Sequence, residues 1–267
     1  MATAKVNGVR LFYELNGTGE VPLVLVHGSW DSHDDWDLVV PRLANSFRVL
    51  TYDRRGHSKS ERSTGRGSVR EDVADLAALI EHLGLGPAWV VGNSFGASIT
   101  LRLASLHPKL FRGLIGHEPP LLSLLRDDPA LAPLLKQVEQ RISAVVERIE
   151  TVALGPGMWA QMPLEPRQTF IENAPTFLDE ASDPEQFAFD LEWIKDFSQP
   201  VLLTLGDQSP PIFAPVVAKL TEALPRVEVL TFPGAGHNPH VTAPDAYVET
   251  ITAFTRKHRP DHAGGET

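Results

Sequence analysis

A short apolar run at residues 88–91 leads directly into the pattern Gly92-x-Ser94-x-Gly96. This pattern is typical of a nucleophile elbow, in which a buried strand ends, the chain reverses sharply and a helix begins at once. Such a turn needs glycine two residues before and two residues after the serine, because side chains there would collide. The next segment, Ala97–Leu106, has helical character. The pattern therefore predicts a strand–turn–helix unit with the Ser94 hydroxyl exposed at its apex.

Predicted strands and helices alternate on both sides of this unit. Several of the strands are almost wholly apolar, as strands buried on both faces should be. The alternation predicts the α/β class, with a mostly parallel central sheet flanked by helices. The predicted strands are Val9–Glu14, Pro22–Val26, Phe47–Tyr52, Ala88–Val91, Leu110–Ile115, Val201–Leu205 and Val227–Phe232, and the predicted helices are Trp36–Asn45, Val69–Leu83, Ala97–Leu106, Val216–Leu224 and Asp245–Arg256.

The alternation stops between Pro119 and Lys195, where the sequence is helix-like and rich in leucine, proline and acidic residues. An insertion of this kind between two strands predicts a helical cap over the carboxyl edge of the sheet, where ligands bind in open α/β folds. We therefore expect a core formed by residues 1–118 and 196–258 and a cap formed by residues 119–195. Residues 259–267 are polar and are predicted to be a disordered tail.

Composition narrows the classes of partner. The 267 residues carry a formal net charge of −10, which argues against nucleic acid or an anionic membrane as a partner. The absence of cysteine excludes disulfides, thiolate metal sites and cysteine nucleophiles, and it is typical of a cytoplasmic protein. The first residues lack the apolar core of a signal peptide. We expect a cytoplasmic protein whose partner is a small molecule, and the oligomeric state stays open.

A serine nucleophile needs a base, and His237 is the strongest candidate. It follows Gly234-Ala-Gly236 in a flexible loop immediately after the last predicted strand. Because that loop leaves the carboxyl end of a strand, it reaches the same edge of the sheet as Ser94. A second histidine, His240, lies close by and is expected to line the pocket or to meet solvent.

An oxyanion hole is predicted from the residues that follow the strand Pro22–Val26, which read His27-Gly28-Ser29-Trp30. We assign the two donors to the backbone N–H groups of Ser29 and Phe95, with Gly28 giving the loop its shape. His27 is interpreted as structural, pinning this loop by hydrogen bonds.

Together these motifs resemble the α/β-hydrolase family, and the resemblance covers nearly the whole chain. It rests on His27-Gly28, Asp53-Arg-Arg-Gly56, the elbow around Ser94, and Gly236-His237. The resemblance implies a cofactor-independent hydrolase with the α/β-hydrolase fold and a lid inserted between its sixth and seventh strands. Serine at position 94 argues against haloalkane dehalogenases and epoxide hydrolases, the two branches of the family that use an aspartate nucleophile.

The acidic member of the triad departs from the family pattern. The family usually has Gly-x-x-Asp-Pro after the strand Val201–Leu205, whereas this chain has serine at 209. A neutral serine cannot balance an imidazolium on the base, so another carboxylate should replace it. Asp207, two residues earlier, is the alternative acid. We favour Glu118, at the end of the strand that follows the elbow helix, because the zearalenone-type lactonases look similar there.

The remaining motifs receive other interpretations. The acidic segment Asp31–Asp35 is interpreted as a solvated loop and helix N-cap rather than a metal site, and neither a metal nor another cofactor is expected. Four side chains are expected to line a substrate pocket. They are Trp30, Trp159, Trp193 and His240.

The sequence thus predicts a serine hydrolase with a Ser94–His237–Glu118 triad. It would cleave a carboxylic ester or lactone of a small, fairly hydrophobic substrate through an acyl-enzyme on Ser94. Perhydrolysis and hydrolysis of a C–C bond in a dienoate are alternatives on the same scaffold, as is an iminopeptidase-like activity. Outside enzymes, the chain could be a degenerate hydrolase that binds a ligand without turnover.

Overall fold

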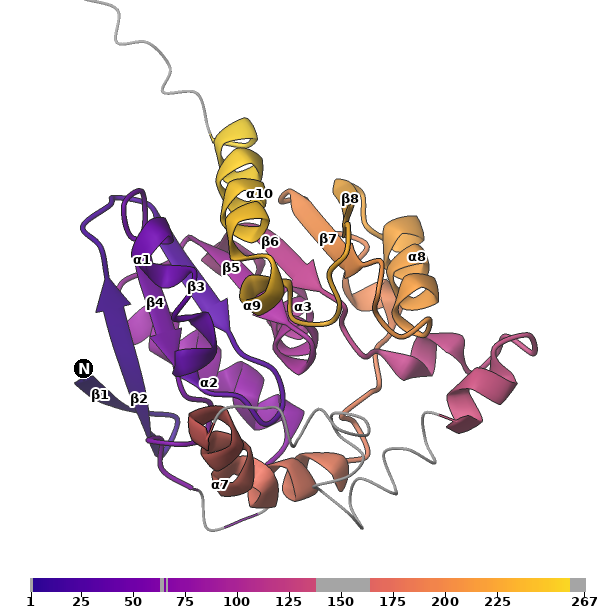
Figure 1. Cartoon of the computed structure of the whole chain (residues 1–267), viewed down its shortest axis with the longest axis horizontal. Helices are drawn as coiled ribbons and strands as arrows, with labels where there is room; N and C mark the ends of the chain where they lie inside the picture. The colour runs from indigo at the N-terminus through magenta and orange to yellow at the C-terminus, as the bar shows by residue number, and fades with distance from the viewer. Residues whose placement is uncertain (1, 63–64, 66, 138–163, 260–267) are drawn as a thin grey trace, which may run out of the picture.

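A computed structural model describes residues 2–62, 65, 67–137 and 164–259. Its centre is an eight-stranded sheet with the order β1-β2-β4-β3-β5-β6-β7-β8 (Figure 1). The pairs β1–β2 and β2–β4 are antiparallel, and the remaining pairs are parallel. The mostly parallel sheet flanked by helices is therefore confirmed.

The elements occur along the chain in the alternating order that the sequence predicts. The strands are β1 Ala2–Val6, β2 Val9–Asn16, β3 Pro22–Val26, β4 Arg48–Tyr52, β5 Ala88–Asn93, β6 Phe111–His117, β7 Val201–Gly206 and β8 Val227–Phe232. The α-helices are α1 Val40–Leu43, α2 Val69–His82, α3 Phe95–Leu106, α7 Leu164–Ala181, α8 Phe213–Ala223, α9 Pro239–Thr242 and α10 Pro244–Lys257, and the 3₁₀ helices are η1 His33–Trp36, η2 Pro108–Leu110, η3 Leu122–Leu125 and η4 Leu191–Trp193.

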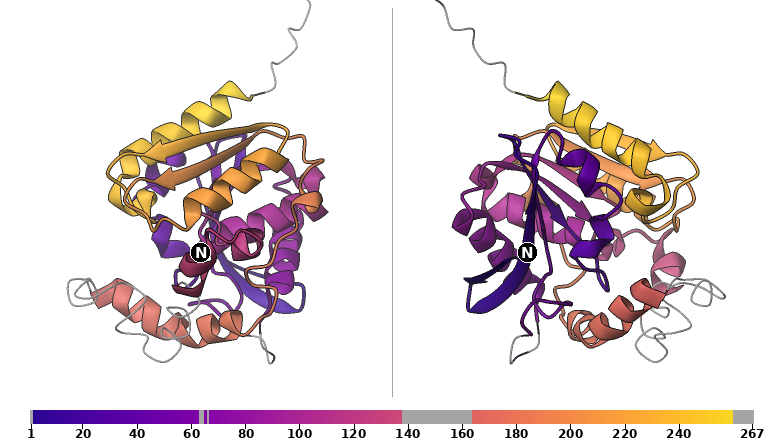
Figure 2. Two further views of the ribbon diagram at one scale, coloured as in Figure 1. Left: turned by 90° about the vertical axis from the view of Figure 1, so that its right-hand side faces the viewer. Right: turned by 60° about the vertical axis from the view of Figure 1, so that its left-hand side comes forward.

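Both faces of the sheet are covered by helices. Along β3 the side chains alternate, so that Val24 and Val26 join the apolar core beneath α2, α3 and α8, while Leu23 and Leu25 join the core beneath α1 and α10. Figure 2 shows α8 and α10 on opposite sides of β7 and β8. This double burial explains why the central strands are almost wholly apolar.

One expectation about secondary structure was wrong, and one strand was not predicted. A helix over Trp36–Asn45 does not form, and the segment contains η1 followed by the short helix α1 instead. Pro41 lies in the first turn of α1, where its missing N–H costs nothing, whereas it would break a helix that began at Trp36. The sequence analysis also missed β1. This edge strand pairs with β2 through a tight turn in which Asn7 and Gly8 both have positive φ.

The chain between β6 and β7 contributes η3, α7 and η4. Figure 1 places α7 beyond the carboxyl ends of the parallel strands. The division into a core of 1–118 and 196–258 and a cap of 119–195 stays a prediction, because residues 138–163 lie outside the described residues, as do 260–267 of the expected tail.

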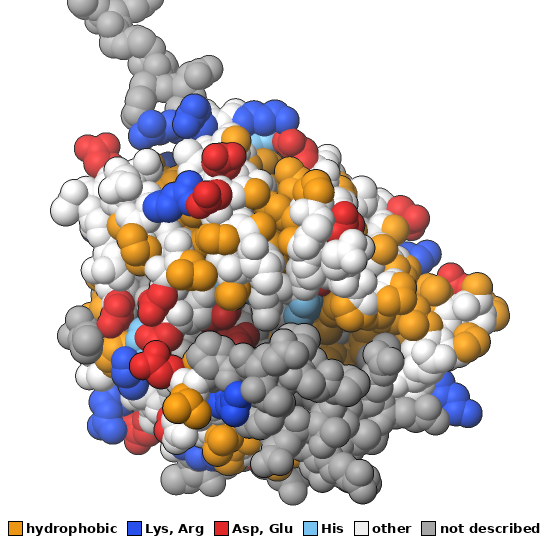
Figure 3. All heavy atoms as spheres, viewed as in Figure 1, with side chains coloured by type: hydrophobic (Ala, Val, Ile, Leu, Met, Phe, Trp, Pro, Cys, Tyr) orange, Lys and Arg blue, Asp and Glu red, His pale blue; other side chains and the backbone are white. Residues whose placement is uncertain are grey.

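The described surface is mixed in charge. Acidic and basic side chains are interspersed on the face shown in Figure 3. Within the described ranges, no helix is both long and apolar enough to cross a bilayer.

Candidate active site

Ser94 occupies a sharp turn between β5 and α3. Its backbone angles are φ 54° and ψ −122°, a conformation that non-glycine residues rarely adopt. A Cβ atom on Gly96 would lie 2.2 Å from the carbonyl oxygen of Val26, and one on Gly92 would lie 2.5 Å from the carbonyl oxygen of Gly96. Glycine is therefore required at both positions, as the nucleophile-elbow pattern predicts.

Hydrogen bonds join the elbow to the two segments that carry the candidate acid and base, the end of β6 and the loop that follows β8. The N–H of Ser94 donates to the carbonyl oxygen of His117 at the end of β6, with a distance of 2.8 Å. The side-chain amide of Asn93 donates to Oδ1 of Asn238, beside His237, over 3.2 Å. Ser94 and His237 both belong to the described residues, and no hydrogen bond joins the Ser94 hydroxyl to the His237 ring.

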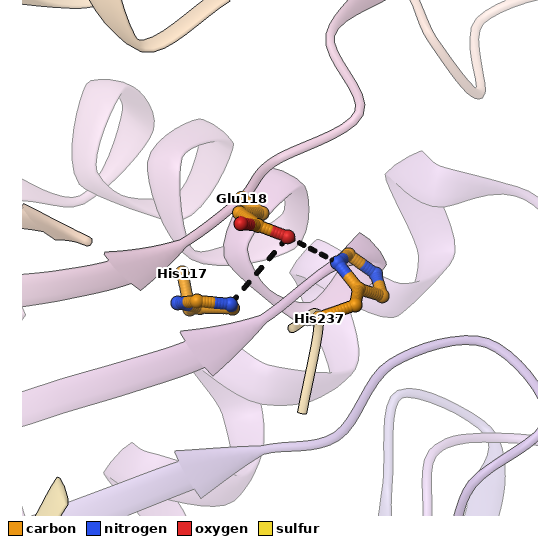
Figure 4. A group of neighbouring side chains, drawn as sticks. All are labelled: His117, Glu118 and His237. Atoms are coloured by element: carbon orange, nitrogen blue, oxygen red, sulfur yellow. Dashed lines mark hydrogen bonds and ion pairs between the residues drawn. The ribbon is translucent and has the colours of Figure 1, made fainter. Parts of the chain in front are cut away.

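Glu118 and His237 are joined directly. Nδ1 of His237 lies 2.6 Å from Oε2 of Glu118, and Figure 4 shows the two side chains pointing toward each other. The other carboxylate oxygen, Oε1, accepts the N–H of Gly206 over 2.7 Å. Because an ionised carboxylate only accepts hydrogen bonds, the proton of a neutral His237 ring must sit on Nδ1, which leaves Nε2 as the basic nitrogen.

The surroundings keep Glu118 ionised. Burial alone would raise its pKa, since the side chain is fully buried. Interactions with the rings of His117 and His237, together with the hydrogen bond from the N–H of Gly206, outweigh that effect and hold the pKa of Glu118 well below its usual range. An ionised carboxylate at this position stabilises positive charge on the His237 ring.

The aromatic ring of Phe213 packs against the ring of His237. The ring of Phe213, at the start of α8, stacks on it with a centroid distance of 4.6 Å and an interplanar angle of 15°. The His237 side chain is 32% exposed, which leaves one side of it accessible. Stacking and the Glu118 hydrogen bond together fix the plane of the ring.

The alternative acid, Asp207, lies elsewhere. Its Oδ1 accepts the N–H of Gly234 at 2.7 Å and the side-chain amide of Gln208 at 3.1 Å. Among the described residues it has no hydrogen bond or ion pair with His237. The role that its contacts support is to shape the loop that follows β8. Of the two carboxylates, the structure brings Glu118 and not Asp207 to the base.

Of the residues predicted for the oxyanion hole, Phe95 follows Ser94 in the chain and Gly28 approaches it in space. A Cβ on Gly28 would lie 3.2 Å from Cβ of Ser94 and 3.0 Å from Oδ2 of Asp31, so glycine allows this loop to approach the serine closely. The N–H groups of Ser29 and Phe95 donate no hydrogen bond to any other described residue. His27 pins the loop through Nδ1 to the carbonyl oxygen of Gly28, over 2.8 Å.

The side chains expected to line a pocket have different surroundings. The Trp30 ring stacks on Phe170 and on Phe177 of α7. Trp193 is 48% exposed and contacts Arg102 and Phe189, and Trp159 lies outside the described residues.

The expectation for His240 was wrong. Its side chain is fully buried, its Nε2 lies 2.7 Å from Oδ2 of Asp35, and its ring packs against Trp36. It therefore neither meets solvent nor faces an open pocket. The acidic segment that supplies Asp35 does form a helix N-cap, at Ser32.

Three residues near the site were missed by the sequence analysis. His117 contacts Thr204 through Nδ1, while its Nε2 lies 3.5 Å from Oε2 of Glu118. Phe213 stacks on His237, and a carboxylate oxygen of Asp31 lies close to Gly28, as does Cβ of Ser94. Only His117 left a signal, as the residue preceding Glu118 at a strand end, whereas the other two depend on how loops and helices pack.

His117, Glu118 and His237 also form a group of metal-ligand type, with donor atoms within 4.8 Å of one another. Both oxygens of Glu118 already accept hydrogen bonds from Gly206 and His237. We therefore interpret the group as an arrangement for proton transfer rather than for binding a metal.

The fold agrees with the comparisons to known proteins. Residues 23–250 match the alpha/beta hydrolase family, and the chain belongs to that family. This confirms the family and the fold that the sequence motifs resemble.

The names of individual relatives describe different activities. The uncharacterised hydrolase YraK of Bacillus subtilis (strain 168) is 38% identical over 140 residues, which cover 52% of this chain and 49% of that protein. The alignment thus spans about half the length of that relative. The bifunctional esterase/perhydrolase DCH of Acinetobacter calcoaceticus is 27% identical over 271 residues, covering 94% of this chain and 97% of that protein.

A similar solved structure is that of Est816, described as an N-acyl homoserine lactone degrading enzyme. It has a TM-score of 0.76 and 22% identity, and it covers 95% of this chain and all of that chain. At this identity, the likeness shows the shared fold.

Proposed function

We propose that the protein is a serine hydrolase that cleaves a carboxylic ester or lactone through an acyl-enzyme on Ser94. The observation that carries this proposal is the 2.6 Å contact between Glu118 and His237, made by residues at two strand ends beside the elbow. A buried, ionised carboxylate on Nδ1 of a histidine prepares Nε2 to accept a proton from a serine hydroxyl.

In the proposed reaction, Ser94 Oγ attacks the substrate carbonyl carbon while His237 Nε2 accepts the hydroxyl proton. No hydrogen bond joins the Ser94 hydroxyl and the His237 ring in the structure, and such bonds often tighten only when substrate is bound. The N–H groups of Ser29 and Phe95 bind the oxyanion, and the N-terminus of α3 adds its positive dipole end. His237 then protonates the leaving alkoxide. Water attacks the acyl-enzyme by the same steps, and Ser94 regains its proton.

The substrate class is argued from the chemistry of the site and from the relatives. A leaving alkoxide needs one proton, which the imidazolium supplies, so esters and lactones fit without further groups. DCH of Acinetobacter calcoaceticus is named as an esterase, and Est816 is described as degrading a lactone. Residues 27–31 are called the oxyanion loop below. The aromatic side chains at this loop, Trp30, Phe170 and Phe177, favour a fairly hydrophobic substrate.

The direct experiment is incubation with p-nitrophenyl acetate and p-nitrophenyl butyrate, together with mass spectrometry after a fluorophosphonate probe. We expect hydrolysis of the esters and a covalent adduct on Ser94, both lost in Ser94→Ala. Ser105→Ala, near the other end of α3, is the matched control and should retain both. If the wild-type protein neither hydrolyses the esters nor gains the adduct, the proposed function is wrong.

Perhydrolysis is the second candidate, because DCH carries that activity in its name beside esterase. In that reaction hydrogen peroxide replaces water as the group that attacks the acyl-enzyme. Adding hydrogen peroxide to the ester assay separates the two. A perhydrolase forms peracetic acid from the acetate ester, whereas a simple esterase releases only acetate.

A further inference from the structure

Helix α7 contacts the oxyanion loop along two parallel stripes of side chains. The polar stripe consists of Asn173, Thr176 and Glu180, which are at most 7% exposed and are spaced three and four residues apart on one face. Buried polar groups on a helix are costly unless they are hydrogen-bonded. All three have partners in loops that follow β3 and β4.

Asn173 joins those two loops. Its side-chain amide donates to the carbonyl oxygens of Trp30 and Asp31, over 3.0 and 2.9 Å, and its Oδ1 accepts the N–H of Ser58 over 2.7 Å. The hydroxyl of Thr176 donates to the carbonyl oxygen of Gly56. Side chains on one side of α7 therefore supply hydrogen-bond partners for backbone groups of these two loops.

The apolar stripe consists of Phe170, Ala174 and Phe177, and it packs against Trp30. The Trp30 ring stacks on Phe177 with a centroid distance of 4.1 Å and on Phe170 with 5.9 Å, and Ala174 belongs to the same buried cluster. Trp30 has φ 74°, which is unfavourable for a bulky residue and persists only where surrounding contacts impose it. The contacts from α7 impose this conformation on the residue that follows Ser29.

Glu180 reaches the peptide group that carries one oxyanion donor. Its Oε2 accepts the hydroxyl of Ser29 over 2.7 Å, and its Oε1 lies 2.7 Å from Nη2 of Arg54. The same Arg54 nitrogen donates to the carbonyl oxygen of Gly28 over 3.0 Å. Burial alone would lower the pKa of Arg54, but the carboxylates of Glu180 and Asp72 raise it, so the guanidinium stays charged.

The Gly28 carbonyl and the Ser29 N–H belong to one planar trans peptide and point in opposite directions. Fixing the carbonyl therefore fixes the direction of the N–H. The Gly28 oxygen has two donors, Arg54 Nη2 and His27 Nδ1. Since Glu180 holds both Arg54 and the Ser29 side chain, it holds this peptide plane from two sides.

We propose that helix α7 aims the Ser29 N–H at the oxyanion, with Glu180 and Arg54 as positioning residues and Asn173 fixing the rest of the loop. This inference rests on the proposed function. In this role α7 contributes to stabilisation of the transition state and does not only cover the substrate. The oxyanion exists in the tetrahedral intermediate, so a misaimed N–H lowers kcat and leaves KM nearly unchanged.

The test compares Glu180→Gln with Glu165→Gln, which makes the same charge change at an exposed position of the same helix. With p-nitrophenyl acetate, Glu180→Gln should lower kcat roughly 10- to 100-fold, less than the about 10²- to 10³-fold lost when an oxyanion donor is removed outright. KM should change less than about twofold, because uniform binding is retained. Glu165→Gln should match the wild type.

A second readout separates aiming from general damage to the fold. An alkyl trifluoromethyl ketone adds the Ser94 oxygen to its carbonyl carbon, the carbonyl oxygen becomes an oxyanion, and His237 takes the hydroxyl proton. Its inhibition constant should rise in Glu180→Gln by the same factor by which kcat/KM falls. Ser29→Ala, which keeps the N–H but loses the link to Glu180, should shift both quantities in the same direction, and it keeps the test valid if Glu180→Gln fails to fold.

The outcomes separate this inference from the proposed function. If the wild type takes no fluorophosphonate label on Ser94, the proposed function fails first. If the wild type is labelled and active but folded Glu180→Gln or Ser29→Ala keeps full kcat/KM, the aiming role of α7 is wrong. A fall in kcat/KM with an unchanged inhibition constant for the ketone also overturns it.

Discussion

Glu118 Oε2 and His237 Nδ1 lie 2.6 Å apart, although 119 residues separate the two positions in the chain. Two strand ends create this contact. Glu118 follows β6 with φ 46°, and His237 follows β8 on the loop that packs beside Asn93. The left-handed backbone at Glu118 turns its carboxylate back toward the sheet edge, where Gly206 and His237 both donate to it.

Neutralising this carboxylate should remove most of the activity. Glu118→Gln keeps the shape of the side chain but cannot balance an imidazolium, so we expect kcat for p-nitrophenyl acetate to fall by about 10⁴-fold, as in other triads. Asp207→Asn is the matched control and should keep most of the wild-type rate. The opposite order of the two variants would move the acid to Asp207.

The same carboxylate shapes the acidic side of the pH profile. The pKa of Glu118 is held well below its usual range, so Glu118 stays ionised wherever the folded protein can be assayed in mild acid. The rise of kcat/KM with pH should then follow a single ionisation, to which Glu118 does not contribute. A profile of kcat/KM in mixed buffers at constant ionic strength measures this, and a rise that needs two protons would contradict it.

Much of the site could be predicted from the sequence because it sits at strand ends. Ser94, Glu118 and His237 each follow a strand that its apolar residues identify, and parallel strands deliver their carboxyl ends to one edge. The contact between Ser29 and Glu180 could not be predicted, because it joins positions 151 residues apart through the packing of α7. His240 was misplaced for a similar reason, since its burial depends on how Trp36 packs.

Gly96 should tolerate no side chain. A Cβ there would lie 2.2 Å from the carbonyl oxygen of Val26, and backbone atoms cannot swing aside. Gly96→Ala should therefore lower the free energy of unfolding by about 3 kcal/mol, measured by urea denaturation. Gly116→Ala is the control, because its nearest contact would be an ordinary 3.4 Å, and it should change the free energy of unfolding by less than about 1 kcal/mol. Equal effects would show that close approach is not the cause.

Buried neutral histidines should make the fold sensitive to acid. Burial lowers the pKa of His27 to about 3, and it also lowers the pKa values of His57 and His117. The unfolded chain binds protons on these residues below their ordinary pKa of about 6.5, so the contribution of these histidines to the free energy of unfolding falls as pH drops from that value toward 3. His27 alone should cost about 2 kcal/mol at pH 5.

Urea midpoints measured between pH 7.5 and pH 4.5 test this acid sensitivity. Asp72, whose pKa burial raises to about 7, binds its proton first in the folded chain and opposes this loss, so the midpoint should fall below about pH 6.5 by less than the histidines alone would give. His82→Gln, at an exposed histidine, should show the same dependence on pH as the wild type. A midpoint that rises as pH falls to 5 would mean that the three buried rings are not held neutral.

Asp31 should lower activity once its carboxyl group ionises. Burial raises its pKa well above the usual range, and the neighbouring Asp35 and Glu180 add to the shift. Oδ2 of Asp31 and Cβ of Ser94 lie 3.0 and 3.2 Å from the position that a Cβ on Gly28 would take, so a carboxylate charge on Asp31 opposes the oxyanion that forms on the substrate. When pH rises through the pKa of Asp31, the charge appears and kcat/KM should fall. Asp31→Asn carries no charge at any pH, so its kcat/KM should stay level where the wild type declines. A decline that persists in Asp31→Asn would have to come from another group.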